Sequence, residues 1–310
     1  MKEYQTKNPY NGSVIATYSQ DTAATINSKL DKAIAIEATW ADMEIADRCQ
    51  LLTNVAELLI DRKEDYAKLM TQEMGKPFSQ GISEIEKCAW VCDFYAHNAE
   101  DLLADEIIET DADESFISND PLGCVLAVMP WNYPYWQVIR FAAPTLTAGN
   151  TALLKHAQNV TGCSLAIEQL FLDAGYPVGC FQSLKAGHEE IEKLIANDGI
   201  KAVTLTGSEK AGKSIARTAG ENLKKTVLEL GGNNACIVWE DADLDQYIDT
   251  MVTARMQNTG QSCIAAKRFI VCEDIYDAFL EKFTKKVKSL KSGDPMDEET
   301  FIGVMAREDL

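Results

Sequence analysis

The sequence lacks the features that place a protein in a membrane. No apolar run approaches the roughly 18 residues needed to span a bilayer. The N-terminal stretch MKEYQTKNPY has no hydrophobic core of the kind found in signal peptides. We therefore expect a cytoplasmic protein.

Basic residues are scarce. The chain has 29 Lys and Arg against 48 Asp and Glu, which gives a formal net charge of −19. Such a charge repels nucleic acid and anionic membrane surfaces unless the basic groups cluster tightly. Only short runs such as Lys285, Lys286 and Lys288 occur. We therefore expect neither nucleic acid nor a membrane as a partner.

Disulfide and metal signatures are also missing. The nine cysteines are scattered and form no CxxC pair, and the three histidines lie far apart in the sequence. An odd number of cysteines in a chain of this length does not indicate a disulfide framework. Cys88 and Cys92 have the spacing of one helix face, where two buried thiols are favoured over a metal site. We predict no metal.

The 310 residues, of which 46% are hydrophobic, are enough to bury a core and to form two domains. From about residue 22 to 103 the apolar residues recur at helical spacing, as Leu52, Val55 and Leu59 do, which predicts several amphipathic helices. Residues 105–122 then alternate and carry turn residues. They predict a hairpin that forms an arm.

From residue 124 the pattern becomes strand, turn and helix, repeated. The predicted strands are CVLAVM (124–129), TALLKH (151–156), FQSLKA (181–186), KAVTLTG (201–207) and KTVLEL (225–230). The predicted helices follow Pro134 and cover 161–174, 188–196 and 208–219. This alternation indicates an α/β fold with a parallel sheet covered on both faces, a Rossmann-like domain within residues 1–230. Strand and helix also alternate across 234–290.

The usual GxGxxG fingerprint is absent. Instead, the stretch TGSEKAG places Gly207, Ser208 and Gly212 where a strand runs into a helix. Amide groups at a helix N-terminus can hold a pyrophosphate when small residues allow close approach. The alternative is a plain N-cap by Ser208 with Gly207 in the turn.

Three further stretches carry reactive side chains. VLELGGNN delivers Glu229 at the carboxyl edge of a sheet, where ligands bind in open α/β folds. VMPWNYPYWQVIR ends a strand with Asn132 between two aromatic residues, and QNTGQSCIAAKR holds Cys263 among small and polar neighbours. A thiolate is a soft and strong nucleophile. A thiol, a carboxylate and an amide form a workable catalytic set.

The segments PWNYP, TGSEKAG, LELGG and NTGQSC, in this order, resemble the NAD(P)-dependent aldehyde dehydrogenase superfamily over essentially the whole chain. The resemblance implies that Cys263 attacks an aldehyde carbonyl. It also implies an oxyanion hole made by the Asn132 side chain and the Cys263 backbone N–H. Glu229 then matches the general base that activates water to release a thioester.

The same resemblance implies NAD or NADP as the cofactor. Ser208 matches the family residue at the pyrophosphate, and Lys155 matches the lysine on the adenosine ribose. Gly207 and Gly212 match the glycines that let the helix approach, and Trp131 lines the same groove. Gln158 replaces a glutamate that NAD-preferring members often carry. Because a neutral amide does not repel a 2′-phosphate, use of both cofactors is expected.

The substrate expected from the resemblance is a small aldehyde, first of all succinate semialdehyde. Arg140 matches an arginine of succinate-semialdehyde dehydrogenases, and arginine binds carboxylates with two hydrogen bonds. The alternative is a surface or interhelix salt bridge. A second arginine of that subfamily would sit where this sequence has Gln257.

The chain is shorter than the members of this family. It lacks their later glutamate–phenylalanine segment and C-terminal strand, so residues 231–310 are expected to form only the first part of a catalytic domain. An intact version is expected to be a homo-oligomer. Two alternatives stay open: a coenzyme A-acylating relative, against which Glu229 speaks, and a truncated, non-catalytic dinucleotide-binding or interaction protein.

Overall fold

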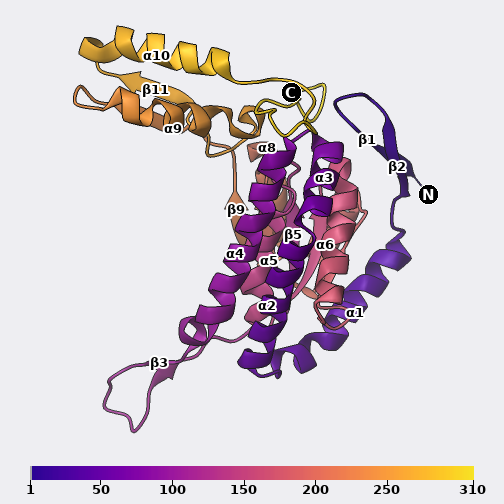
Figure 1. Cartoon of the computed structure of the whole chain (residues 1–310). Helices are drawn as coiled ribbons and strands as arrows, with labels where there is room; N and C mark the ends of the chain where they lie inside the picture. Colours follow the sequence, from indigo (N-terminus) through magenta and orange to yellow (C-terminus); the bar gives the residue numbers. More distant parts are fainter. Residues whose placement is uncertain (1) are drawn as a thin grey trace.

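The computed structural model of the protein describes residues 2–310. An antiparallel hairpin, β1 (Glu3–Lys7) and β2 (Val14–Ser19), comes first. Four helices follow: α1 (Ala23–Ala41), α2 (Ile45–Asp61), α3 (Lys63–Met74) and α4 (Phe78–Leu103). A short hairpin, β3 (Glu106–Ile107) and β4 (Phe116–Ile117), protrudes from the body at the end opposite the C-terminus (Figure 1).

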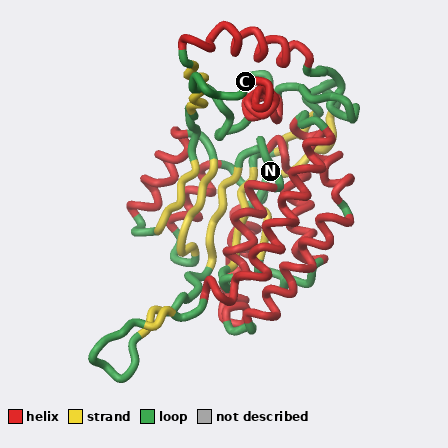
Figure 2. Tube along the Cα trace, turned by 60° about the vertical axis from the view of Figure 1, so that its left-hand side comes forward, coloured by secondary structure: helices red, strands yellow, loops and turns green. Residues whose placement is uncertain are grey.

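The centre of the fold is a five-stranded sheet with the order β7-β6-β5-β8-β9, and all four pairings are parallel. Its strands are β5 (Cys124–Met129), β6 (Thr151–His156), β7 (Phe181–Ser183), β8 (Ile200–Thr206) and β9 (Lys225–Glu229). The connecting helices are α5 (Trp136–Thr147), η1 (Gln158–Val160), α6 (Thr161–Asp173), α7 (His188–Ala196) and α8 (Glu209–Glu221). The strands lie side by side with helices packed around them (Figure 2).

Side chains that alternate along the strands enter two separate cores. Ala127 and Leu154 pack with α2 to α6, whereas Leu126 and Leu153 pack with α1, α7 and α8. Neighbouring residues of one strand point to opposite faces, so both faces of the central strands are buried. The prediction of an α/β fold with a parallel sheet covered on both faces is therefore confirmed.

The predicted strand FQSLKA is longer than the strand observed. FQSLKA was expected to continue to residue 186, but β7 ends at Ser183. The Leu184 N–H still bonds to the Leu154 carbonyl, whereas the Lys185 N–H donates to the Asp21 carboxylate at 3.0 Å. Alternate N–H groups of a strand face its neighbour, so the Lys185 N–H, like that of Ser183, faces away from β6, and Asp21 binds the outer side of this edge. Pairing with β6 ends at the Leu154–Ser183 pair.

A second, smaller α/β unit follows the sheet. It contains the parallel pair β10 (Ala235–Val238) and β11 (Arg268–Val271) with α9 (Leu244–Met256), η2 (Gln257–Gly260), η3 (Glu273–Ile275) and α10 (Tyr276–Ser289). Its core is built around Val238, Leu244 and Phe279. Ile237 and Trp239 remain exposed by more than half. This unit lies across the end of the layers where the C-terminus is found (Figure 1).

No helix within residues 2–310 combines the length and the apolar character needed to cross a membrane. Cys88 and Cys92 are both fully buried in α4. In the same described range, no three His, Cys, Asp or Glu side chains gather as a possible metal site.

Candidate active site

The candidate site lies at the carboxyl edge of the sheet, where the loop after β5 meets the turn before Cys263. The Asn132 side-chain amide donates to the Gln261 carbonyl at 3.0 Å. In return, the Asn258 side-chain amide donates to the Asn132 carbonyl at 2.7 Å. These two bonds join segments that are more than a hundred residues apart in the sequence. One of the two Asn132 amide hydrogens remains available for a ligand.

The turn that presents Cys263 has an unusual backbone. Asn258, Thr259 and Gly260 all have positive φ, at 56°, 57° and 75°. Two consecutive non-glycine residues in this region cost free energy, so surrounding contacts must hold them. The Gln80 side chain accepts from the Asn258 N–H at 2.6 Å, and the Thr259 hydroxyl accepts from the Gly303 N–H at 3.1 Å. The braced turn leaves Cys263 half-buried.

The end of β9 reaches the same place. Glu229 is the last residue of β9 and is exposed. Three residues later, a Cβ added to Gly232 would lie 3.5 Å from the Cys263 carbonyl oxygen. The Lys267 ammonium donates to the carbonyls of Gly232 at 2.7 Å and of Cys263 at 2.6 Å. The structure thus brings the Asn132, Glu229 and Cys263 segments together at one edge.

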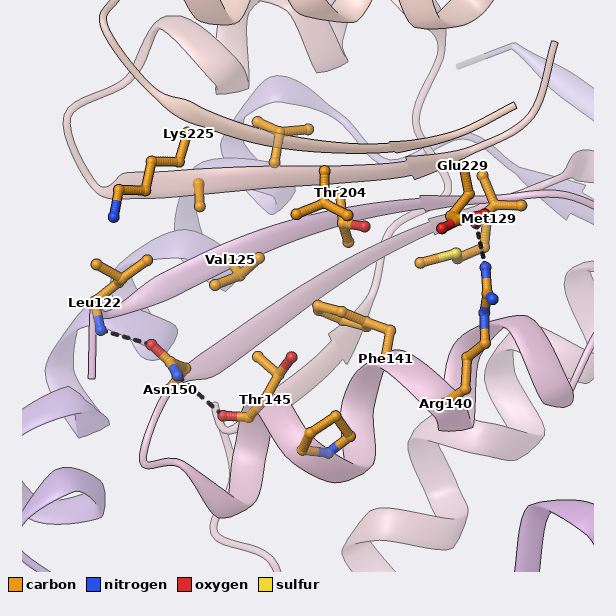
Figure 3. A pocket seen from close by; sticks show the side chains of 15 residues that line it. Leu122, Val125, Met129, Arg140, Phe141, Thr145, Asn150, Thr204, Lys225 and Glu229 are labelled. Atoms are coloured by element: carbon orange, nitrogen blue, oxygen red, sulfur yellow. Dashed lines mark hydrogen bonds between the residues drawn. The ribbon is translucent and has the colours of Figure 1, made fainter. Parts of the chain in front are cut away.

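A groove of about 440 Å³ runs over the sheet from this edge and is lined by residues of β5, α5, β8 and β9. Arg140, Thr206 and Glu229 lie at one end of it, as Figure 3 shows for the labelled Arg140 and Glu229. The Arg140 guanidinium donates to the Thr206 hydroxyl at 3.2 Å. Among the described residues it has no acidic partner within ion-pair distance, so the salt bridge considered as an alternative is not observed. Asn132 and Cys263 do not line this groove.

The junction between β8 and α8 contains Gly207, Ser208 and Gly212, the three residues singled out in the TGSEKAG stretch. The Ser208 hydroxyl accepts from the Ala211 N–H at 3.2 Å and caps α8, as the plain N-cap interpretation expects. The remaining first-turn N–H groups of a helix still have no intrahelical partner. At Gly207 the nearest atom to an added Cβ is 3.7 Å away, so space for a ligand remains. At Gly212 an added Cβ would meet Leu230 at 2.7 Å, so this glycine lets α8 pack on the end of β9.

Lys155 lies near the carboxyl end of β6 and is partly buried. Burial lowers its pKa, and within residues 2–310 no acidic side chain or hydrogen-bond acceptor pairs with its ammonium. A partly buried cation without a partner fits an oxygen-rich or anionic ligand. Gln158 follows in η1 with an exposed side chain. Trp131, in the loop after β5, packs against the core, and the Arg307 guanidinium lies 5.7 Å from its ring centroid.

His156, the neighbour of Lys155, is buried beneath the Asn132 loop. Its Nε2 lies 2.9 Å from the Pro134 carbonyl oxygen, and its Nδ1 lies 3.2 Å from the Met129 carbonyl oxygen and 2.9 Å from the Ala157 nitrogen. Burial lowers the pKa of His156 from its ordinary 6.5 to about 4, although the carbonyls of Pro134 and Met129 oppose the shift.

We expect this buried ring to make the fold sensitive to mild acid. Between about pH 6.5 and about pH 4 the unfolded chain binds the His156 proton and the folded chain does not, so stability falls as the pH falls. From pH 7 to pH 5 the loss is about 2 kcal/mol. Urea unfolding of the wild type and of His156→Gln at both pH values measures it. If the two proteins show the same pH dependence, the ring does not contribute as described.

Several site residues were not predicted from the sequence. Thr206, Lys267, Asn258 and Gln261 all bond to predicted site residues or to their loops. Asn258 and Gln261 lie inside the NTGQSC stretch, where two amide side chains next to a thiol were an available signal. Lys267 gave no comparable signal, because its role depends on two backbone carbonyls that meet only in the folded chain.

The fold and this edge define the class: a Rossmann-like α/β protein with a cysteine-bearing turn beside the ligand-binding end of its sheet. The chain belongs to the aldehyde dehydrogenase family, whose sequence pattern matches residues 1–309. It is 51% identical over 305 residues to a probable succinate-semialdehyde dehydrogenase (NADP(+)) of Synechocystis sp., covering 98% of this chain and 67% of that protein.

Two further relatives agree with this assignment. A succinate-semialdehyde dehydrogenase (NADP(+)) of Mycolicibacterium paratuberculosis is 45% identical over 98% of this chain and 65% of its own length. The crystal structure of succinic semialdehyde dehydrogenase from Streptococcus pyogenes in complex with NADP+ has a TM-score of 0.96 and 38% identity, covering 98% of this chain and 67% of that one. The chain therefore spans about two thirds of the length of these curated relatives, 67% and 65%.

Proposed function

We propose that the protein oxidises an aldehyde, succinate semialdehyde in the first place, to the carboxylic acid with NAD(P), as a relative of the aldehyde dehydrogenases described above. The observation that carries the proposal is the pair of hydrogen bonds between the Asn132 loop and the Cys263 turn, with the segment that follows Glu229 packed against Cys263. An amide donor, a thiol and a carboxylate thereby share one sheet edge.

The reaction begins when the Cys263 sulfur attacks the aldehyde carbon and forms a thiohemiacetal. The carbonyl oxygen gains negative charge in this step, so donors placed beside it stabilise the transition state. The free Asn132 amide hydrogen and the Cys263 backbone N–H supply them, and one such donor is typically worth about 3 kcal/mol. NAD(P), when bound, would supply the acceptor for the hydride of the thiohemiacetal carbon.

The thioester left on Cys263 must then be hydrolysed. Glu229, exposed at the end of β9, takes a proton from a water molecule that attacks the thioester carbon. The carbon–sulfur bond breaks, the carboxylic acid leaves and the thiol is restored. A carboxylate at this position also speaks against a relative that passes the acyl group to coenzyme A.

The cofactor is proposed to lie across the sheet edge between β6 and β8. Lys155, which has no partner among the described residues, would hold the adenosine ribose, and the N-terminus of α8 at Gly207 and Ser208 would face the pyrophosphate. Trp131 would line the groove that holds the cofactor. Gln158 adds no negative charge beside the ribose, and several relatives are named for NADP(+). We therefore propose NADP or NAD.

We propose two domains that meet near residues 230 and 231, because the five-stranded sheet ends at Glu229 and the second sheet starts at Ala235. We also propose a cytoplasmic homo-oligomer that binds no nucleic acid. The protruding β3–β4 hairpin, on which Ile107 is 70% exposed, supports self-association, and the net charge of −19 opposes nucleic-acid binding.

The substrate assignment is tested at Arg140. If its guanidinium binds the carboxylate of succinate semialdehyde, Arg140→Ala lowers kcat/KM for this substrate by roughly ten- to a hundred-fold, because a charge-assisted hydrogen bond is lost. Pentanal, an uncharged aldehyde of similar length, is affected far less. Steady-state kinetics measure kcat/KM of both substrates for the wild type and for Arg140→Ala. A loss caused by general damage to the fold affects both substrates equally, so it cancels when the two ratios are compared.

Thr206→Val is the matched control for this test. It removes the acceptor of the Arg140 hydrogen bond but keeps the positive charge in the groove. We expect a smaller loss than for Arg140→Ala. If Arg140→Ala slows succinate semialdehyde and pentanal by the same factor, Arg140 is structural and the substrate is another aldehyde.

A further inference from the structure

A lysine and a glutamate are buried together beneath the candidate site. The side chains of Lys76 and Glu84 are 1% and 2% exposed, and they form an ion pair at the start of α4. Desolvation lowers the pKa of Lys76, and the carboxylate of Glu84 opposes this shift. Burying two charges costs free energy that their attraction offsets only with good geometry and further hydrogen bonds. The further contacts of this pair therefore indicate its role.

Glu84 binds the start of α5. One carboxylate oxygen accepts from the N–H groups of both Tyr135 and Trp136, each at 2.9 Å. These two residues directly follow the loop that carries Asn132. The Lys76 ammonium lies 3.9 Å from the ring centroid of Tyr133 in the same loop. The buried pair thus holds the loop by its backbone and by its aromatic side chain.

The same helix also holds the Cys263 turn. Gln80 precedes Glu84 by one helical turn on the same face of α4 and accepts from the Asn258 N–H at 2.6 Å. The Gln80 amide donates to the Phe301 carbonyl at 2.8 Å, which fixes its orientation. The first turns of α4 therefore hold, by hydrogen bonds, both the end of the Asn132 loop and the turn that begins at Asn258.

We propose that Lys76 and Glu84 are positioning residues, which hold the Asn132 amide at the distance from Cys263 that oxyanion stabilisation requires. This inference rests on the proposed function. Glu84 acts through the α5 N-terminus, where its charge strengthens hydrogen bonds to N–H groups. Lys76 compensates the buried charge and fixes Tyr133. The hydrogen bond between Asn132 and Gln261 then transmits the position of the loop to the Cys263 turn.

Two double variants separate the contributions of charge and of the acceptor. Lys76→Met/Glu84→Gln removes both charges together, so no unpaired buried charge is left, and keeps an oxygen that can accept from Tyr135 and Trp136. Lys76→Met/Glu84→Met removes the acceptor as well. For the second variant we expect kcat to fall roughly ten- to a hundred-fold with the cofactor Kd unchanged, because small misplacements of catalytic groups have effects of this size. The glutamine variant retains more of kcat.

A cycle with Asn132→Ala tests whether the pair acts through Asn132. If it does, the Lys76→Met/Glu84→Met change causes almost no further loss of kcat in the Asn132→Ala background. Losses that multiply in full would show that the pair supports the fold only, and would overturn the positioning role. Absence of aldehyde oxidation in the wild type would instead count against the proposed function.

Hydrogen exchange tests the same proposal without any activity. In Lys76→Met/Glu84→Met, peptides covering residues 257–263 should exchange faster, although Glu84 does not touch them. Glu73→Met is the matched control, because buried Glu73 likewise accepts from two backbone N–H groups, of Gly162 and Cys163, at the N-terminus of another helix, α6. Equal exchange at 257–263 in the double variant and in Glu73→Met would overturn the proposal even if the chain shows no turnover.

Discussion

Replacing Cys263 with alanine is expected to abolish aldehyde oxidation and to leave cofactor binding nearly unchanged. The thiol forms the covalent intermediate in the proposed reaction, and alanine offers no nucleophile. Removal of a nucleophile costs at least roughly a thousand-fold in kcat. The residues proposed to hold the cofactor, Lys155 and Ser208, lie at the ends of other elements. Reduction of NADP+ measures turnover, and fluorescence titration measures cofactor binding.

The chain offers two matched controls for this substitution. Cys236 and Cys272 are partly exposed thiols in the same α/β unit as Cys263. Cys236→Ala and Cys272→Ala should retain turnover, because neither residue lies in the turn that Asn132 contacts. Residual oxidation above a tenth of the wild-type rate in Cys263→Ala would show that another group is the nucleophile. An equal loss in all three variants would indicate damage to the unit rather than to the reaction.

The sheet could be predicted from the sequence because its strands are buried on both faces. CVLAVM is a continuous apolar run and TALLKH contains the apolar run 152–154, and each is separated from the next strand by a segment of helical length. Runs of this kind are typical of parallel strands. The end of β7 could not be predicted in the same way. It is set by where β6 stops pairing with β7, at the Leu154–Ser183 pair, and the pattern of FQSLKA does not show this limit.

The candidate site, too, could be predicted from the sequence only in part. Cys263, Glu229 and Asn132 could be proposed from the sequence because each lies in a short stretch, NTGQSC, LELGG or PWNYP, that points to chemistry by itself. The groups that brace them were not found. Glu84 and Gln80 lie in an amphipathic helix, where a charged or polar residue is usually assigned to the solvated face. Only the fold shows that Glu84 faces the backbone of α5 instead.

The buried pair and the left-handed turn hold the site through contacts that need no ligand. The turn at Asn258 and Thr259 is held from α4 by Gln80 and from the C-terminal segment by Gly303. The Asn132 loop is held from α4 by Glu84. Because one helix positions both partners, their relative placement does not depend on flexible side chains at the surface. Such preorganisation is what oxyanion stabilisation requires.

Replacing Glu229 with glutamine should separate the two halves of the reaction. Glutamine preserves the shape of the side chain at the end of β9 but cannot accept the proton of water. The thioester on Cys263 should therefore still form, while its hydrolysis becomes slow. Rapid mixing should show a burst of NADPH close to the concentration of sites, followed by a steady state that is slower by roughly a hundred-fold or more.

The burst distinguishes a base from a residue that merely binds substrate. If Glu229 only contributed to substrate affinity, Glu229→Gln would raise KM, leave kcat unchanged and show no burst. If Glu229 also deprotonates the Cys263 thiol, the burst itself becomes slow, and raising the pH restores its rate because the thiolate forms without help. Mass spectrometry of the quenched protein identifies the acyl group on Cys263 directly. A variant that hydrolyses its thioester at the wild-type rate would show that another group near Cys263 activates the water.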